Sequence, residues 1–169
     1  MRYFVDLFSP ETTKAFSKSD QSTSGFRISR KTYVENQEIG LGDKFICYCT
    51  RVQRFIGVLE IQSAPFIDNK PIFTETDDPF TLRFKVKPLI WLPLEKSIPV
   101  HEDFIWYNLS FTKNLSKDSN RWTYMVFSSP RLWPKEDCEY LEQLLIRQAK
   151  ELKEFPFSLN DEKKLKTSK

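Results

Sequence analysis

The pattern of apolar and polar residues along the chain predicts about six β-strands. Short runs rich in aromatic and β-branched residues, some of them alternating with polar positions, are typical of half-buried strands. The clearest runs span Tyr3–Phe8, Lys44–Thr50, Phe55–Ser63, Leu82–Leu92 and Trp122–Phe127. The four residues 51–54 between the second and third runs are short enough to form a hairpin.

Two residues inside these runs predict irregular strand pairing. Gly57 has no side chain, so we expect a bulge there, or a place where another group approaches the backbone closely. Pro88 lacks the N–H that a ladder needs and therefore marks a bend or an edge of its strand.

Helix signals separate the strands. Ser9, Pro10 and Glu11 combine a hydroxyl cap, a proline in the first turn and an acid near the positive end of the dipole, which predicts a helix to about Lys18. A short helix is expected at 30–36, and a short helix or turn over 104–111. Pro134 opens the clearest helix. Its predicted apolar face comprises Tyr140, Leu141, Leu144, Leu145, Ala149 and Leu152.

The remaining segments predict turns and loops. Gly40–Asp43 has turn composition, and 113–121 is a polar loop. Residues 64–80 hold three prolines and an acidic run (Glu75, Asp77, Asp78), which indicates a long surface loop. Residues 128–133 are expected to be irregular, and the charged tail from Asn160 to be disordered.

Together these elements predict an α+β domain built on a partly closed β-barrel of about six strands with flanking helices. A single domain is expected at 1–159, densest in motifs over 1–93 and with a C-terminal helix at 134–153, followed by a tail at 160–169. No GxGxxG or P-loop sequence occurs, and only four glycines are present. The pattern therefore does not favour a nucleotide-binding parallel sheet.

The aromatic content is the unusual feature of the composition. Fifteen Phe, six Tyr and four Trp make up 15% of the 169 residues, more than a small core needs for its volume. We therefore expect a Phe-packed core with some rings at a recognition surface. The net charge of +3 fits an anionic partner without requiring one, and 40% hydrophobic residues exclude wholesale disorder.

No set of residues predicts catalysis, a metal or a cofactor. His101 is the single histidine and has no nucleophile at a fixed spacing, so we interpret it as a surface residue. Cys47, Cys49 and Cys138 form an odd number without a disulfide framework, which fits structural thiols in a reducing compartment. No apolar run approaches the ~20 residues of a membrane span. The sequence thus predicts a cytoplasmic, non-enzymatic protein, by default a monomer, that does not bind membranes.

Two stretches suggest a barrel that holds a flat ligand between a loop and a strand: 42–68, with two strand patterns and a closing loop, and the small-residue loop expected upstream at 22–27. Asp68 follows a strand, where its carboxylate either accepts from the N–H of a base or caps its own loop. Arg27 either holds a phosphate or anchors its loop, beside Gly25, which permits close approach.

The aromatic rings and the basic side chains near these stretches can each be interpreted as binding residues or as structural ones. Tyr48 lies on one strand face with Thr50, and the rings of Tyr48, Phe26, Phe66 and Trp91 either sandwich a ligand or pack in the core. Five basic residues either line the rim of the site and contact phosphates or are scattered surface charges. They are Arg27, Arg30, Lys31, Arg51 and Arg54.

Taken in order, the motifs of the chain resemble those of an EVE domain, of the PUA-like superfamily that also includes the YTH and ASCH domains. The resemblance covers roughly residues 1–150. It rests on FSPET at 8–12, Ser24-Gly25-Phe26-Arg27, Gly42-Asp43, Tyr48-Cys49-Thr50, Gly57-Val58-Leu59-Glu60 and Phe66-Ile67-Asp68.

The resemblance implies a reader of a modified base, such as a modified cytosine, in DNA or RNA. EVE and YTH domains hold such a base in a pocket, in bacteria often beside restriction or defence modules. Carried over position by position, the pocket residues would be Ser24, Gly25, Phe26, Arg27, Tyr48, Thr50, Phe66 and Asp68. Relatives of thymocyte nuclear protein carry Trp-Asp before the loop glycine, where this chain has Thr23-Ser24, so one wall would be missing or supplied by Trp91, Trp106 or Trp122.

Two other functions stay open at this point. An ASCH-like nuclease or hydrolase would need a compact set of acids, or a Lys-Tyr-Arg cluster, in the pocket. A protein-interaction module of a bacterial defence complex would use an exposed apolar stripe on the helix from Pro134 to Leu152.

Overall fold

The structure is a computed structural model that describes residues 1–73 and 80–166. The acidic part of the predicted 64–80 loop lies outside the described residues. The strands are β1 (Tyr3–Phe8), β2 (Thr23–Phe26), β3 (Lys44–Cys49), β4 (Arg54–Ile61), β5 (Phe66–Ile67), β6 (Leu82–Trp91), β7 (Ile98–Pro99) and β8 (Arg131–Leu132).

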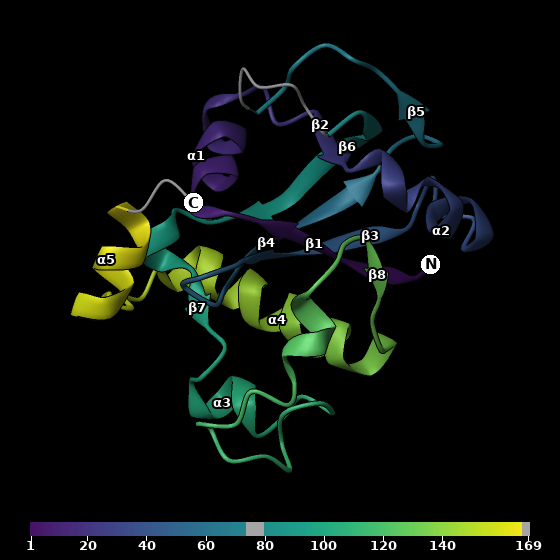
Figure 1. Cartoon of the computed structure of the whole chain (residues 1–169). Coiled ribbons are helices and arrows are strands. Elements are labelled where there is room, and N and C mark those ends of the chain that lie inside the picture. Colours follow the sequence, from purple (N-terminus) through teal and green to yellow (C-terminus); the bar gives the residue numbers. More distant parts are fainter. Residues whose placement is uncertain (74–79, 167–169) are drawn as a thin grey trace.

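The strands form one curled sheet in the order β2-β6-β4-β3-β1-β8, with β5 beside β6 and β7 beside β4. Strands β1 and β3 are parallel and the other pairs are antiparallel. The predicted α+β half-barrel is confirmed, with six strands on its main path. Figure 1 shows the sheet in the middle of the molecule, with helices on both of its faces.

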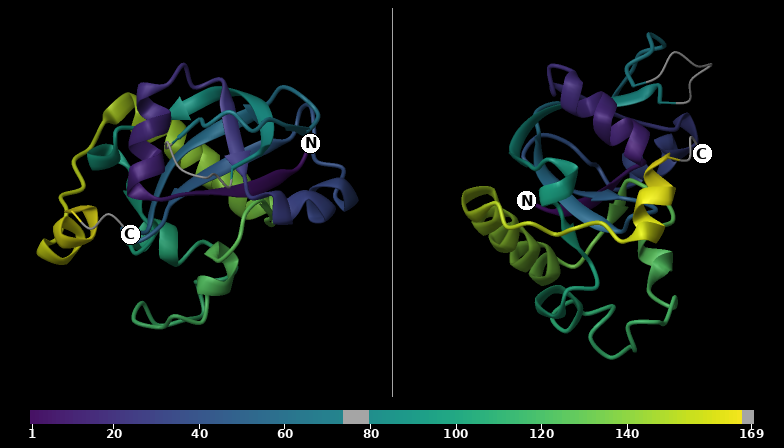
Figure 2. Two further views of the ribbon diagram at one scale, coloured as in Figure 1. Left: turned by 45° about the horizontal axis from the view of Figure 1, so that its top comes forward. Right: turned by 90° about the vertical axis from the view of Figure 1, so that its left-hand side faces the viewer.

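The helices are α1 (Pro10–Lys18), α2 (Lys31–Asn36), α3 (Asp103–Trp106), α4 (Lys135–Glu151) and α5 (Leu159–Lys166), with 3₁₀ turns η1 (Ile28–Arg30), η2 (Leu94–Lys96) and η3 (Thr123–Val126). Helix α1 lies on one face of the sheet and α4 crosses the other, as the two turned views show (Figure 2). None of the described helices is long and apolar enough to cross a membrane.

Strand β1 is buried on both faces, and its alternation divides the interior into two cores. Tyr3 and Val5 belong to the core beneath α4, whereas Phe4 and Phe8 belong to the core inside the half-barrel. Successive strand side chains point to opposite faces, so one strand supplies both cores. The inner core is packed from phenylalanine rings, as the composition suggested.

Helix α1 begins where the cap signals predicted. The Ser9 side chain accepts a hydrogen bond from the backbone of Thr12, and the Thr12 hydroxyl accepts from the Ser9 N–H, which completes a capping box. The predicted turn before β3 is also present, with Gly42 at a φ of 93° and an Asp43 carboxylate oxygen accepting from the Gly40 N–H.

Gly57 lies where strand β6 approaches most closely. A Cβ added at Gly57 would stand 2.3 Å from the carbonyl oxygen of Ile90. The strand registers shift next to Gly57 between Cys47 and Tyr48, and again where Leu59 pairs with Pro88. The predicted close approach at Gly57 and the predicted bend at Pro88 are therefore confirmed.

The half-barrel stays open between β1 and β2, which are not paired in the described structure. One side-chain hydrogen bond spans this seam: Ser24 Oγ donates to Asp6 Oδ2 over 2.6 Å. Both residues are buried, and desolvation raises the pKa of Asp6 to about 8. The carboxyl group is therefore largely neutral in the folded chain at pH 7.

The expected strand at Trp122–Phe127 is wrong, because residues 123–126 form the 3₁₀ turn η3. A strand would bury alternate residues, but here Trp122 and Met125, three apart, enter the core while Tyr124 stays exposed. The neighbouring segment, expected to be irregular, contains the short strand β8, which pairs with β1.

Two further expectations differ from the structure at the C-terminal end. The buried face of α4 includes Glu142 and Gln148, while Ala149 and Leu152 are exposed. Glu142 is buried because it binds Lys44 Nζ and the Tyr3 hydroxyl. The tail expected to be disordered from 160 contains helix α5, and residues 167–169 lie outside the described part.

We expect Gly57→Ala to destabilise the fold by about 1–3 kcal/mol, because the methyl group would force β4 and β6 apart. Urea unfolding followed by circular dichroism measures the effect. Gly40→Ala is the matched control, since a Cβ at Gly40 meets nothing within 4 Å. Equal stability of the two variants would contradict the close approach.

We expect the stability of the chain to fall as pH rises from about 4 to 8, because the raised pKa of Asp6 means that the folded state holds a proton that the unfolded state releases. Asp6→Asn should abolish several kcal/mol of this pH-dependent loss of stability and flatten the plot of melting temperature against pH. Ser24→Ala removes the hydrogen bond that lowers the pKa of Asp6, so the decline should begin at the same pH and continue to a higher pH. Equal slopes in all three proteins would refute a buried, protonated Asp6.

Candidate functional site

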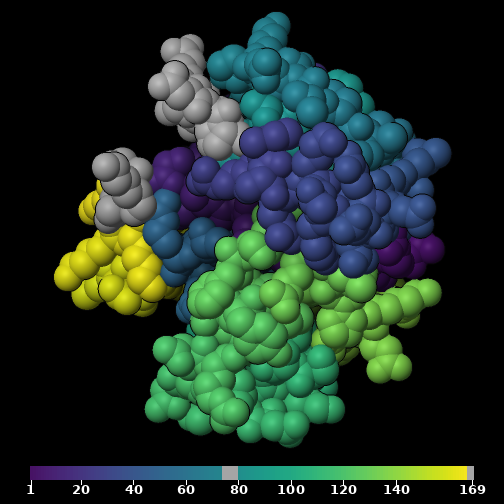
Figure 3. Space-filling model, turned by 45° about the vertical axis from the view of Figure 1, so that its right-hand side comes forward, coloured from purple at the N-terminus to yellow at the C-terminus, as the bar shows by residue number. Residues whose placement is uncertain are grey.

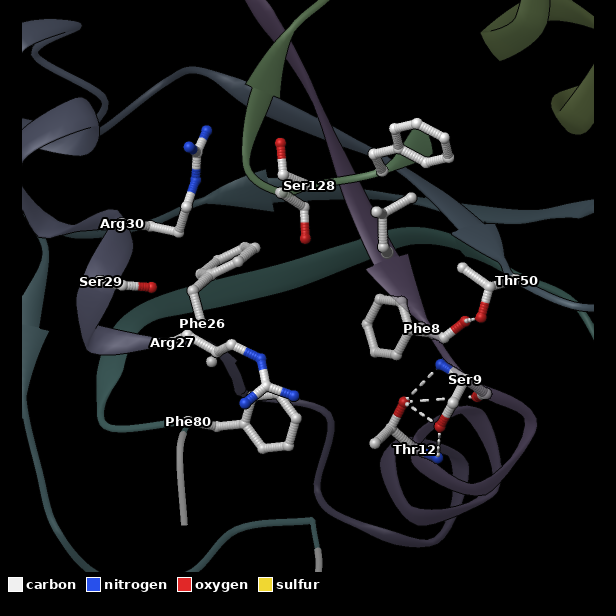
Figure 4. A pocket seen from close by; sticks show the side chains of 14 residues that line it. Phe8, Ser9, Thr12, Phe26, Arg27, Ser29, Arg30, Thr50, Phe80 and Ser128 are labelled. Atoms are coloured by element: carbon white, nitrogen blue, oxygen red, sulfur yellow. Dashed lines mark hydrogen bonds between the residues drawn. The ribbon is translucent and has the colours of Figure 1, made fainter. Parts of the chain in front are cut away.

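A cavity of about 330 Å³ lies in the seam of the half-barrel. Its lining comes from the end of β1, the start of α1, the end of β2 with η1, and the segment before β8. Figure 4 shows Phe26, Arg27 and Arg30 on one side of the cavity and Phe8, Ser9, Thr12 and Thr50 on the other. The cavity therefore occupies the place where the sheet fails to close.

Four phenylalanines line the cavity. Phe8 and Phe26 are buried, and their rings are fixed by ring contacts in the inner core, such as Phe26 with Phe45 at 5.2 Å between centroids. Phe80 is half-buried, whereas Phe127 is 76% exposed at the edge of the cavity. The site thus combines two rigid walls with two rings that solvent reaches.

Arginines supply the positive charge of the cavity. The Arg27 guanidinium lies 5.7 Å from the centre of the Phe80 ring, as Figure 4 shows. Arg30 donates through Nη2 to the Pro130 carbonyl at 2.6 Å, and its buried Nε has no partner in the described structure. Among the described residues, neither arginine is paired with a carboxylate.

The hydroxyls of the cavity differ in their freedom to bind a ligand. Ser9 and Thr12 bond each other in the capping box, and Thr50 Oγ1 donates to the Phe8 carbonyl at 3.2 Å. Ser29 and Ser128 also line the cavity (Figure 4). Their hydroxyls form no hydrogen bond within the described residues, so they can face a ligand.

The backbone of β2 adds a polar edge. The Val86 N–H donates to the Ser22 carbonyl, so Ser24 and Phe26, in alternate positions, bond to β6. The peptide groups of Gly25 consequently point away from β6, toward the seam. Gly25 is also closely packed, since a Cβ there would stand 2.9 Å from Ile72.

The structure brings together five of the residues singled out from the sequence. Gly25, Phe26, Arg27 and Thr50 line the cavity, and so does Arg30 from the expected rim. Ser24 lies directly behind them and faces the interior, where it binds Asp6.

The structure does not bring Tyr48, Phe66 or Asp68 to this cavity. Tyr48 points to the core beneath α4, opposite to the cavity, and burial raises its pKa. Phe66 and Asp68 line a separate cavity of about 270 Å³, and β6 lies between β5 and β2. There an Asp68 carboxylate oxygen lies 3.3 Å from Arg83 Nη1, so local pairing accounts for the carboxylate.

The other expected rim residues have structural partners. Lys31 pairs with Glu35 one helical turn away, and Arg51 pairs with Glu11 at the start of α1. Arg54 is 1% exposed and donates to the carbonyls of Ser97 and Pro156.

The C-terminal segment covers Arg54. The Phe157 ring lies 4.1 Å from its guanidinium, and burial lowers the pKa of this arginine. The guanidinium is thus enclosed by the chain itself.

None of the three tryptophans considered for the missing wall lines the cavity. Trp91 packs on Phe16 at 4.5 Å between ring centroids, and its Nε1 donates to Ser17 Oγ. Trp106 and Trp122 lie in the other core, where His101 stacks on Trp106. Burial lowers the pKa of His101, which is also remote from the cavity. Phenylalanines form the cavity walls instead.

Sequence reasoning missed Phe8, Phe80 and Phe127 as wall residues. Phe8 stands between a strand end and a helix cap, a local signal that could have placed it at a rim. The segment that contains Phe127 reaches the cavity only through the pairing of β8 with β1, more than 120 residues apart, so no local signal marks it.

Among the described residues, the titratable side chains that line the cavity are Arg27 and Arg30. Within the described residues, no group of three or more His, Cys, Asp or Glu side chains could hold a metal ion. The three cysteines are buried, and burial raises the pKa of each thiol. The arrangement is suited to stacking, hydrogen bonding and binding of an anion rather than to proton transfer.

No protein-family model and no curated protein sequence matches the chain. Several solved YTH domains share its fold. The Mmi1 YTH domain superposes with a TM-score of 0.60 at 12% identity, covering 89% of this chain and 78% of that one. The Pho92 YTH domain in complex with m6A gives 0.57 at 16%, covering 85% of both chains.

The YTH domain of the Zygosaccharomyces rouxii MRB1 protein, in complex with N6-methyladenosine RNA, gives a TM-score of 0.56 at 14% identity and covers 85% of this chain and 86% of that one. These likenesses show that the chain has a PUA-like fold of the YTH kind. The narrower EVE assignment stays a prediction based on the motifs.

Proposed function

We propose that this chain binds nucleic acid by holding one unstacked, modified base in the seam cavity. The observation that carries the proposal is the lining of that cavity, with phenylalanine rings on several sides and two arginines that pair with no carboxylate among the described residues. Rings can stack on the faces of a base, and arginines can contact the adjoining phosphates.

The free-energy cost of unstacking a base and the gain from binding it are similar in size. Taking a base out of a stack costs a few kcal/mol, and stacking on an aromatic side chain returns about 1–3 kcal/mol per base. An added methyl group on the base gains about 1–3 kcal/mol in an apolar pocket that it fills. A modified base would therefore be preferred where its extra group contacts the apolar walls formed by Phe8 and Phe26 rather than water.

The comparisons support this proposal at the level of the fold. The Pho92 and MRB1 structures contain N6-methyladenosine, and another Mmi1 structure is a complex with RNA. N6-methyladenine in RNA is therefore the first ligand to test. Modified cytosines in DNA or RNA remain the alternative, with Gly25 supplying backbone donor and acceptor groups at the seam.

The other two functions have weaker support. A hydrolase needs a general base or an activated nucleophile, and the described lining of the cavity offers hydroxyls and two arginines without a base to activate a hydroxyl. A partner-binding α4 would need an exposed apolar stripe, but Leu141 and Leu145 are buried against the sheet. We therefore keep binding without chemistry as the proposed function.

The test is a fluorescence-anisotropy titration with short RNA and DNA single strands. Each strand carries one central N6-methyladenine, 5-methylcytosine or 5-hydroxymethylcytosine, or no modification. We expect one modified strand to bind at least about fivefold more tightly than its unmodified counterpart. Affinity should fall with rising salt, because arginines contact phosphates.

Phe80→Ala should weaken binding of the preferred strand by about 5- to 100-fold, since it removes one stacking wall. Phe104→Ala is the matched control, a partly exposed phenylalanine on α3 that does not line the cavity. Asp68→Ala should also leave binding unchanged, because its carboxylate pairs with Arg83 outside the cavity. Equal binding of all the RNA and DNA strands, or an equal effect of the two phenylalanine variants, would refute the proposal.

A further inference from the structure

A pair of exposed aromatic rings lies on η3, next to the seam cavity. Tyr124 is 49% exposed and Phe127 is 76% exposed. Side chains three apart eclipse each other in a 3₁₀ turn, so these two rings share its outer side, while Trp122 and Met125 share the buried side. We call Tyr124, Phe127 and Arg131 the η3 surface.

Contacts with the Arg131 and Trp133 side chains fix the backbone of the η3 surface. The Arg131 guanidinium lies 5.4 Å from the centre of the Tyr124 ring, and its Nη1 donates to the Tyr124 carbonyl at 3.1 Å. The Trp133 indole donates to the Met125 carbonyl at 3.1 Å. The rings are therefore exposed on a fixed backbone.

The η3 surface is continuous with the cavity. Phe127, Ser128 and Ser129 themselves line the cavity. The same segment is tied to the opposite wall, because Arg30 donates to the Pro130 carbonyl and the Leu132 N–H donates to the Tyr33 hydroxyl. Figure 3 shows the green atoms of this region directly against the indigo atoms that follow β2.

Charge distinguishes this region from an ordinary apolar patch. Two of the segments that line the cavity, 21–34 and 119–135, contain no Asp or Glu. They carry Arg27, Arg30, Lys31, Arg121, Arg131 and Lys135. Such a cationic border complements a polyanion and disfavours an acidic or purely apolar partner.

We propose that the η3 surface stacks the nucleotides adjoining the base held in the cavity, which makes the chain a reader of single strands rather than duplexes. The inference rests on the proposed function, and it adds a second, sequence-tolerant contact area. Faces of bases are accessible for stacking on protein rings only where the strand is unpaired. Arg131, beside Tyr124, is placed to contact the phosphate between two stacked nucleotides.

The experiment compares Tyr124→Ala and Phe127→Ala with Tyr107→Ala. Tyr107 is a matched control because it is 55% exposed, lies beneath a cation (Lys117), directly follows α3 and does not line the cavity. Each protein is titrated with the preferred modified single strand, with its duplex and with the free modified nucleoside. Circular dichroism melting confirms folding.

For the single strand we expect each η3 variant to lose about 5- to 100-fold in affinity, with Tyr107→Ala unchanged. Tyr124→Ala should leave binding of the free nucleoside unaltered, because Tyr124 does not line the cavity. Wild-type protein should bind the duplex more weakly than the single strand.

Three results would overturn the inference: η3 variants that behave like Tyr107→Ala, a duplex bound as tightly as the single strand, or an effect of the η3 variants on self-association alone. If the modified strand is preferred but the η3 variants behave normally, only this inference fails. If no strand is preferred over its unmodified counterpart but the η3 variants still lose single-strand binding, the stacking surface stands and the modified-base proposal fails.

Discussion

Strand β1 forms one side of the opening in the half-barrel, and its position determines where a ligand can enter. It pairs in parallel with β3 along its whole length and with β8 only near its start. Its second half therefore faces β2 across a gap in which the described residues form no backbone ladder, and the hydrogen bond from Ser24 to Asp6 spans this gap. A curled sheet that closed fully would have no seam and no cavity there.

The two cores explain how such an opening is tolerated. Because β1 contributes side chains to both faces, the sheet remains sandwiched between α4 and the helices of the inner side, even though its barrel is incomplete. The walls of the cavity are the outermost members of the inner core, so Phe8 and Phe26 are fixed by the same ring contacts that stabilise the fold. Rigid walls of this kind favour preorganised binding.

Local signals predicted much of this architecture. The cap at Ser9, the turn at Gly42, the close approach at Gly57 and the start of α4 each depend on residues adjacent in sequence, and each agrees with the structure. Local signals failed where residues distant in the sequence determine which side chains are buried. Glu142 is buried because Lys44 and Tyr3, which are 98 and 139 residues away in the sequence, bind its carboxylate.

The same distinction holds for the site. Gly25, Phe26 and Arg27 were predicted together because they are consecutive, and Tyr48 was placed with them although strand alternation turns its ring to the other core. Asp68 follows β5, which β6 separates from β2, and it pairs there with Arg83 of β6. Phe127 was missed because β8 brings it to the cavity from the far end of the chain.

The buried carboxyl group at the seam has a consequence for folding itself. At neutral pH an unfolded chain carries Asp6 as an anion, whereas the raised pKa in the folded chain makes it a neutral acid, so closing the seam takes up a proton from solvent. The heat of folding should then depend on the ionisation enthalpy of the buffer. The group that joins β1 to β2 also presents no negative charge to a polyanion lying along the opening.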